Sequence, residues 1–63
     1  MRKITIKDTQ RAKLLLERKQ DELENDEKNL CSAIINLYLR GKEIADVQYN
    51  AFKTLHRRII NNW

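Results

Sequence analysis

The chain has 63 residues, so it forms one domain at most and lies near the lower size limit for independent folding. Proteins this short usually add disulfides, a metal or a second subunit, but the single cysteine, Cys31, and the single histidine, His56, exclude an internal disulfide and a four-ligand zinc site. The net charge of +4 is split between basic residues 1–20, acidic residues 21–29 and basic residues 40–63, which permits nucleic-acid binding without requiring it.

The composition favours helix over sheet. Proline is absent and Gly41 is the single glycine, whereas a sheet protein needs turn residues at about every tenth position. The longest uncharged run, residues 29–39, is about half of what spans a bilayer. The first residues lack the apolar stretch of a secretion signal. We therefore expect an all-α cytoplasmic protein with no membrane segment.

The N-terminus is expected to form an extended arm. Polar and β-branched apolar residues alternate over residues 3–7, which is typical of a short strand or an extended segment with Ile4 and Ile6 on one face. Thr5 and Asp8 have the spacing of a capping box.

Strong helix formers predict a first helix over about residues 9–24 and a second over about residues 26–40. The alternative is one continuous helix over residues 9–40, since this stretch lacks Gly and Pro and has leucines at seven-residue spacing. These leucines are Leu16, Leu23, Leu30 and Leu37. The companion positions are polar, which is poor for a zipper, so we favour a break near residues 24–27.

Residues 30–39 form the densest apolar stretch. On a helix, Ser32, Asn36 and the following Arg40 form its one polar stripe. A helix that is apolar on nearly all sides is surrounded by other helices, and one copy of this chain supplies few neighbours. We therefore predict a dimer with this helix at its centre. The predicted dimer core consists of Leu30, Ile34, Leu37, Phe52 and Leu55.

Gly41 is predicted to end the second helix in the left-handed conformation, and Asp46 to cap a last helix over about residues 47–62. The apolar face of this last helix is expected to hold Ala51, Phe52, Leu55, Ile59 and Trp63, and to be widened by Tyr49, His56 and Ile60. Its basic end is either a solvated face favoured by the helix dipole or a surface that contacts a partner. The contact candidates are Tyr49, Lys53, His56, Arg57, Arg58 and Trp63.

No catalytic, cofactor or metal site is predicted. Cys31 lies in the apolar run, where burial keeps a thiol protonated, and it is 25 residues from His56. A nucleophile needs an adjacent base, and a bound phosphate needs a Gly-rich loop, which the chain lacks. We therefore expect no enzymatic activity, no cofactor and no small-molecule substrate.

Residues 3–7, followed by a helix, resemble the start of a ribbon-helix-helix DNA-binding domain. The resemblance implies paired strands from two subunits in the major groove, with Lys3, Thr5 and Lys7 facing the DNA. Residues 24–27, Glu-Asn-Asp-Glu, stand where this family usually has Gly-x-Ser, and the last helix is additional. A dimeric DNA-binding repressor is thus the alternative function.

A second resemblance involves the run Leu30-x-x-Ala33-Ile34-x-Asn36-Leu37-x-Leu39-x-Gly41-x-x-Ile44. This run is similar to the core of the small biofilm-regulator, two-component connector proteins of enteric bacteria. The resemblance implies a helical dimer that modulates a transcription-regulatory signalling protein by direct contact. Phe52 and Leu55 are out of step with that family's last helix.

These patterns predict a single three-helix domain over residues 1–63, with an extended arm over residues 1–7, assembled as a dimeric helical bundle. The predicted function is that of a small regulatory protein that binds a partner protein and modulates or inhibits it. The expected partner is a transcription-regulatory or host-defence component. The size and the Lys-, Asn- and Ile-rich composition also suit a product of a phage or other mobile element.

Overall fold

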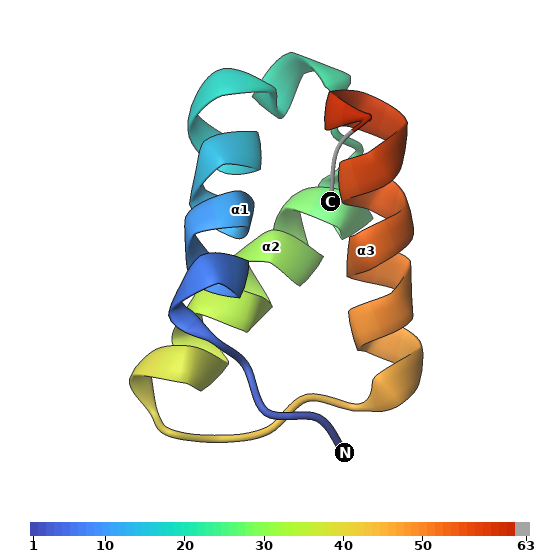
Figure 1. The fold of residues 1–63 in the computed structure, drawn as a ribbon. Helices are drawn as coiled ribbons and strands as arrows, with labels where there is room; N and C mark the ends of the chain where they lie inside the picture. Colours follow the sequence, from blue (N-terminus) through green and yellow to red (C-terminus); the bar gives the residue numbers. More distant parts are fainter. Residues whose placement is uncertain (62–63) are drawn as a thin grey trace.

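A computed structural model describes residues 1–61 of the chain. Three α-helices and a short 3-10 helix make up its regular structure: α1 (Ile6–Arg18), η1 (Gln20–Glu22), α2 (Asn25–Leu39) and α3 (Asp46–Ile60). Helices α1 and α3 lie on opposite sides, and α2 crosses between them (Figure 1). The prediction of an all-α, three-helix fold is confirmed.

Helix α1 begins at Ile6 and not near residue 9, because Thr5 is its N-cap. The Thr5 side chain accepts a hydrogen bond from the Asp8 amide at 3.2 Å, and the Asp8 carboxylate accepts one from the Thr5 amide at 3.0 Å. This reciprocal capping box satisfies two backbone donors that a helix start otherwise leaves unpaired. The strand interpretation of residues 3–7 is therefore wrong, because the helix already includes Ile6.

The segment before α1 is extended but packs against the rest of the chain. Arg2 and Ile44 form an isolated antiparallel bridge, with N–H···O distances of 2.7 and 2.9 Å. Ile4 is buried in the core, whereas Ile6 is 55% exposed, so the two side chains do not share a face. The segment before α1 thus contributes Ile4 to the core.

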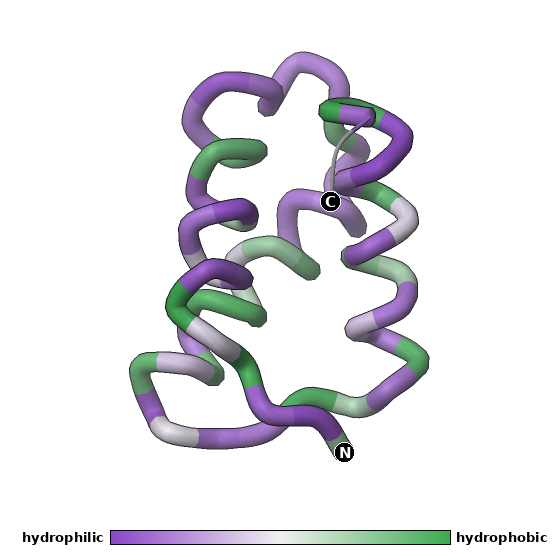
Figure 2. Tube along the Cα trace, in the orientation of Figure 1, coloured by the Kyte–Doolittle hydropathy of each residue, from purple (hydrophilic) through white to green (hydrophobic). Residues whose placement is uncertain are grey.

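The chain breaks between α1 and α2, so it does not form one helix over residues 9–40. Helix α1 ends at Arg18 and not near residue 24, and η1 leads into the extended residue Leu23, which is buried. A second capping box, between Glu24 and Glu27, starts α2. The turn between the two helices is largely hydrophilic (Figure 2), which fits its place at the surface.

Gly41 ends α2 as predicted. Its φ of +68° is left-handed, and the Lys42 amide donates to the Leu37 carbonyl at 2.9 Å. The start of α3 differs from the prediction, because Asp46 is the first helical residue and the N-cap is Ala45, which has no side-chain cap. Asp46 still favours the helix through its charge near the positive end of the dipole.

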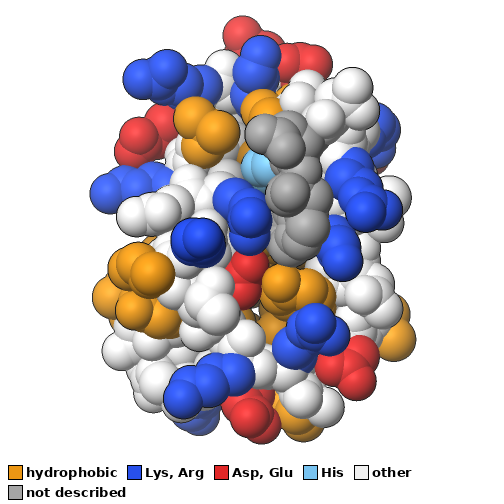
Figure 3. Space-filling view, viewed as in Figure 1, with side chains coloured by type: hydrophobic (Ala, Val, Ile, Leu, Met, Phe, Trp, Pro, Cys, Tyr) orange, Lys and Arg blue, Asp and Glu red, His pale blue; other side chains and the backbone are white. Residues whose placement is uncertain are grey.

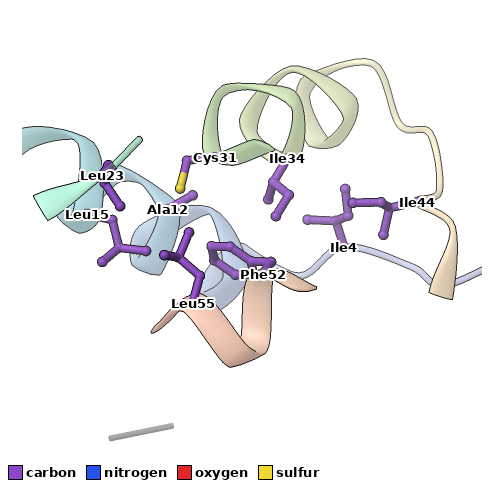
Figure 4. Packing of buried hydrophobic residues seen from close by; sticks show 9 residues of the cluster. All are labelled: Ile4, Ala12, Leu15, Leu23, Cys31, Ile34, Ile44, Phe52 and Leu55. Carbon is purple, nitrogen blue, oxygen red and sulfur yellow. The ribbon is translucent and has the colours of Figure 1, made fainter. Parts of the chain in front are cut away.

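The core is formed by one copy of the chain, with residues from all three helices and from the segments around them (Figure 4). Ile4 and Ile44 lie side by side at one end of it. The buried apolar residues are Ile4, Ala12, Leu15, Leu23, Cys31, Ile34, Ile44, Phe52 and Leu55. Ala51, which was expected on the apolar face of the last helix, is exposed instead.

Most residues of the predicted dimer core are buried within the single chain. Ile34, Phe52 and Leu55 are buried there, and Leu30 and Leu37 are half-buried. The sequence predicts a dimer because α2 is expected to lack neighbours, but α1, α3 and the segments carrying Ile4 and Ile44 supply them. The dimer stays a prediction, without the packing argument that motivated it.

Candidate interaction surface

Tyr49, a predicted contact residue on α3, is engaged within the chain. Its hydroxyl donates to Asp8 Oδ1 at 3.2 Å, and the Arg2 guanidinium lies 4.5 Å from the centre of its ring. Burial raises the pKa of Tyr49, and the nearby Asp8 carboxylate adds to this effect. Its first role is therefore to hold α3 against α1 and the N-terminal segment.

Asp8 is the acceptor at the centre of this polar cluster and is 2% exposed. It binds the Thr5 amide, the Tyr49 hydroxyl and, at 3.5 Å, the Arg11 guanidinium. A buried carboxylate is tolerated when it is paired and hydrogen-bonded, as here. The sequence signalled the cap but not the contact with Tyr49, which lies on another helix.

His56 does not lie on a contact surface, because it is 4% exposed. Its ring packs beside that of Phe52, with a centroid distance of 6.5 Å. Lys53 is half-buried and has interactions within the chain. Trp63, the remaining aromatic candidate, lies outside the described residues.

Arg57 and Arg58 are both exposed, and Arg58 is engaged within the chain. Consecutive helical residues point about 100° apart. Arg58 is directed at the start of α2, where it donates to Glu27 Oε2 at 2.7 Å. The pKa of Glu27 is lowered, first by the hydrogen bond from the Glu24 amide and then by Arg58. Arg58 thus serves to tie α3 to α2.

The predicted DNA-contacting residues do not share a strand. Thr5 is the N-cap of α1, Lys7 lies inside α1, and Lys3 precedes the helix. A ribbon formed by these residues would require the first turn of α1 to unwind and the capping box to break.

An apolar groove between α1 and α2 is the feature that the sequence did not reveal. Its volume is about 420 Å³. It is lined by Ile6, Thr9, Gln10 and Lys13 from α1 and by Ile35, Tyr38 and Leu39 from α2. Figure 3 shows hydrophobic side chains reaching the surface on this α1 side of the molecule. A helix started at Ile6 would have placed these α1 residues on one face by their i, i+3, i+4, i+7 spacing, but three of the four are polar and give no apolar signal.

Two of the groove's side chains are exposed aliphatic residues. Ile6 is 55% and Leu39 75% exposed, so neither contributes much to the core. A second hollow, of about 470 Å³, also has Tyr38 in its lining and lies between the N-terminal segment and the turn after α2. It is lined by Lys3, Ile4, Tyr38, Gly41, Lys42 and Glu43. Because both hollows have Tyr38 in their lining, we treat them together and call them the α1–α2 groove.

Cys31 lies in the core, and burial raises the pKa of its thiol to about 11, with a smaller contribution from the negative charge of Glu27. Over residues 1–61, no three His, Cys, Asp or Glu side chains come together as a metal site. In the same part of the chain, none of the helices has the length and apolar character needed to cross a bilayer.

Comparisons with known proteins give no relative: no family model, curated protein sequence or solved structure matches the chain. The two family resemblances therefore stay predictions, and the geometry of the surface carries the functional argument.

Proposed function

We propose that the chain is a small regulatory binding protein that docks onto a partner protein through the α1–α2 groove and modulates or inhibits that partner. The observation that carries this proposal is the pairing of Ile6 and Leu39, two exposed aliphatic side chains from different helices, at one groove. Exposed apolar side chains that gather at a concave surface are typical of a protein-binding site.

The energetics favour a protein partner at this groove. Full burial of one Leu or Ile side chain stabilises a complex by about 1.5–3 kcal/mol. Leu39 retains most of this free energy for binding and Ile6 about half, because folding leaves them 75% and 55% exposed. Ile35 and Tyr38, which are half-buried, provide a floor that is already ordered in the free protein.

DNA binding is the less favoured function. The proposed ribbon of Lys3, Thr5 and Lys7 is not formed, since α1 starts at Ile6 and holds Lys7. Protein binding requires no such rearrangement. A transcription-regulatory or host-defence component is the partner class that we propose, in keeping with the small size of the chain.

Capture of partners by two matched variants tests this function. Leu39→Gln removes an apolar side chain at the groove, and Val47→Gln removes one that is 80% exposed on α3 and lines neither hollow. We expect immobilised wild type and Val47→Gln to retain the same protein from a lysate of the source cells, and Leu39→Gln to lose it. Equal retention by all three, or retention of DNA alone, would contradict the proposal.

A further inference from the structure

We propose that the occupant of the α1–α2 groove is an apolar segment of the partner flanked by carboxylates, such as an amphipathic helix with Asp or Glu beside its apolar face. This inference deepens the proposed function and depends on it. It follows from the charges around the groove.

The apolar part of the groove sets the first requirement on the occupant. Ile35 and Tyr38 are recessed, and Ile6 and Leu39 stand more exposed beside them. A concave apolar surface of this kind accepts projecting Leu, Ile or Phe side chains, as in helix-in-groove recognition. The flat surface of a membrane would contact Ile6 and Leu39 but leave the recessed floor unfilled.

The rim of the groove sets the second requirement. Lys13 lines one hollow, and Lys3 and Lys42 line the other, against a single acid, Glu43. Within the described part of the chain, none of these three lysines forms an ion pair, whereas Arg11 and Arg58 each do. Lysines without a counter-charge around an apolar groove favour carboxylates at the matching positions of a partner.

The same charges disfavour a second copy of this chain as the occupant. In a twofold dimer the same patch meets itself, so Lys13 and Lys42 of one copy would approach those of the other. Like charges brought together at an interface oppose association, and no acidic rim is present to offset them. The core also needs no second copy, because one chain already encloses Ile34, Phe52 and Leu55.

Selection of binders from a random peptide library displayed on phage tests the inference. The target is the full chain, and each selected peptide is then measured against purified variants. We expect the peptides to combine Leu, Ile or Phe with Asp or Glu. We expect the Lys13→Glu, Lys42→Glu double variant to weaken their binding by about tenfold or more. Arg18→Glu, a charge reversal in the last turn of α1, is the matched control and should change binding by about twofold or less.

The outcomes separate the inference from the proposed function. Peptides that require Leu39 for binding but lack Asp and Glu would contradict an acidic occupant, and so would peptides that bind the double variant as well as wild type. Either result would still support binding at the groove. Self-association of the chain that Leu39→Gln abolishes, measured by sedimentation, overturns it in favour of a second copy. Binding to anionic vesicles that depends on Leu39 overturns it in favour of a lipid surface. Peptides whose binding is unaffected by Leu39→Gln overturn the groove itself, and with it both proposals.

Discussion

Tyr49 and Asp8 are 41 positions apart in the sequence, and the Tyr49 hydroxyl donates to Asp8 Oδ1 at 3.2 Å. The bond connects α3 to the first turn of α1, where the same carboxylate closes the capping box with Thr5. One buried group therefore serves both the start of a helix and the contact between two helices. A change on either side of the bond should affect the stability of the whole fold.

The Tyr49 hydroxyl can be removed without removing its ring. Tyr49→Phe keeps the surface under the Arg2 guanidinium but leaves the buried Asp8 carboxylate with one donor fewer. We expect the free energy of unfolding to fall by about 1–2 kcal/mol, measured by urea denaturation. Tyr38→Phe is the control and should change it by less than about 0.5 kcal/mol, because it lies half-buried at the groove. Equal effects of the two changes would mean that the bond to Asp8 contributes little.

The hydrogen-bonded ion pair between Glu27 and Arg58 should make the stability of the fold depend on pH in the acidic range. The folded pKa of Glu27 is below its ordinary value of 4.5, so the carboxylate stabilises the fold above that pH, and this contribution is lost as the pH falls through the folded pKa. Glu27→Gln should therefore be less stable than wild type at pH 7. The gap in melting temperature should close as the pH is lowered below about 4. A gap that stays constant from pH 7 to pH 3 would contradict this role.

Cys31 should be slow to react while the chain is folded. It is buried, and at pH 8 a thiol with a pKa of about 11 is ionised in about one molecule in a thousand. We expect iodoacetamide to label the native protein about 100-fold more slowly than the urea-unfolded protein. The raised pKa stabilises the fold below the ordinary value of 9.0, and this contribution is lost as the pH rises toward 11. Rapid labelling of the native protein would show that α2 opens readily.

Substitutions at Gly41 measure how much the left-handed backbone conformation alone costs in stability. A Cβ atom added there meets nothing within 4 Å, so the cost of Gly41→Ala comes from the φ of +68° alone. We expect a loss of about 1 kcal/mol for Gly41→Ala, and a smaller loss for Gly41→Asn, because asparagine tolerates the left-handed region better. Thermal melts of the two variants compare them directly. No loss with Gly41→Ala would indicate that the turn after α2 rearranges.

Local patterns in the sequence were sufficient for the parts of the fold that depend on nearby residues. The glycine that ends α2, the apolar burial of Cys31 and the spacing of Thr5 and Asp8 are of this kind. Residues 3–7 were misread because alternation over five residues also fits a chain that leaves an extended segment and enters a helix. There the capping box at Thr5 decides the outcome.

Contacts between distant segments were beyond such patterns. A polar residue on an apolar helix face can lie inside or outside, and for His56 the close packing beside Phe52 places it inside. The neighbours expected for α2 were helices only. The expectation therefore left out Ile4 and Ile44, which lie outside the helices and also pack in the core. The groove was missed because it needs Ile6 in a helix and Leu39 beside it, from two elements that the sequence does not place together.

Photo-crosslinking at the groove tests the central claim most directly. A photoreactive benzoylphenylalanine at position 39, on the rim of the groove, is compared with the same group at position 47, which is similarly exposed on α3. After illumination in the source cells, docking through the groove predicts one discrete adduct from position 39, with a mass that is not twice that of the chain, and none from position 47. Adducts from position 47 alone, or an adduct at position 39 with twice the mass of the chain, would contradict it.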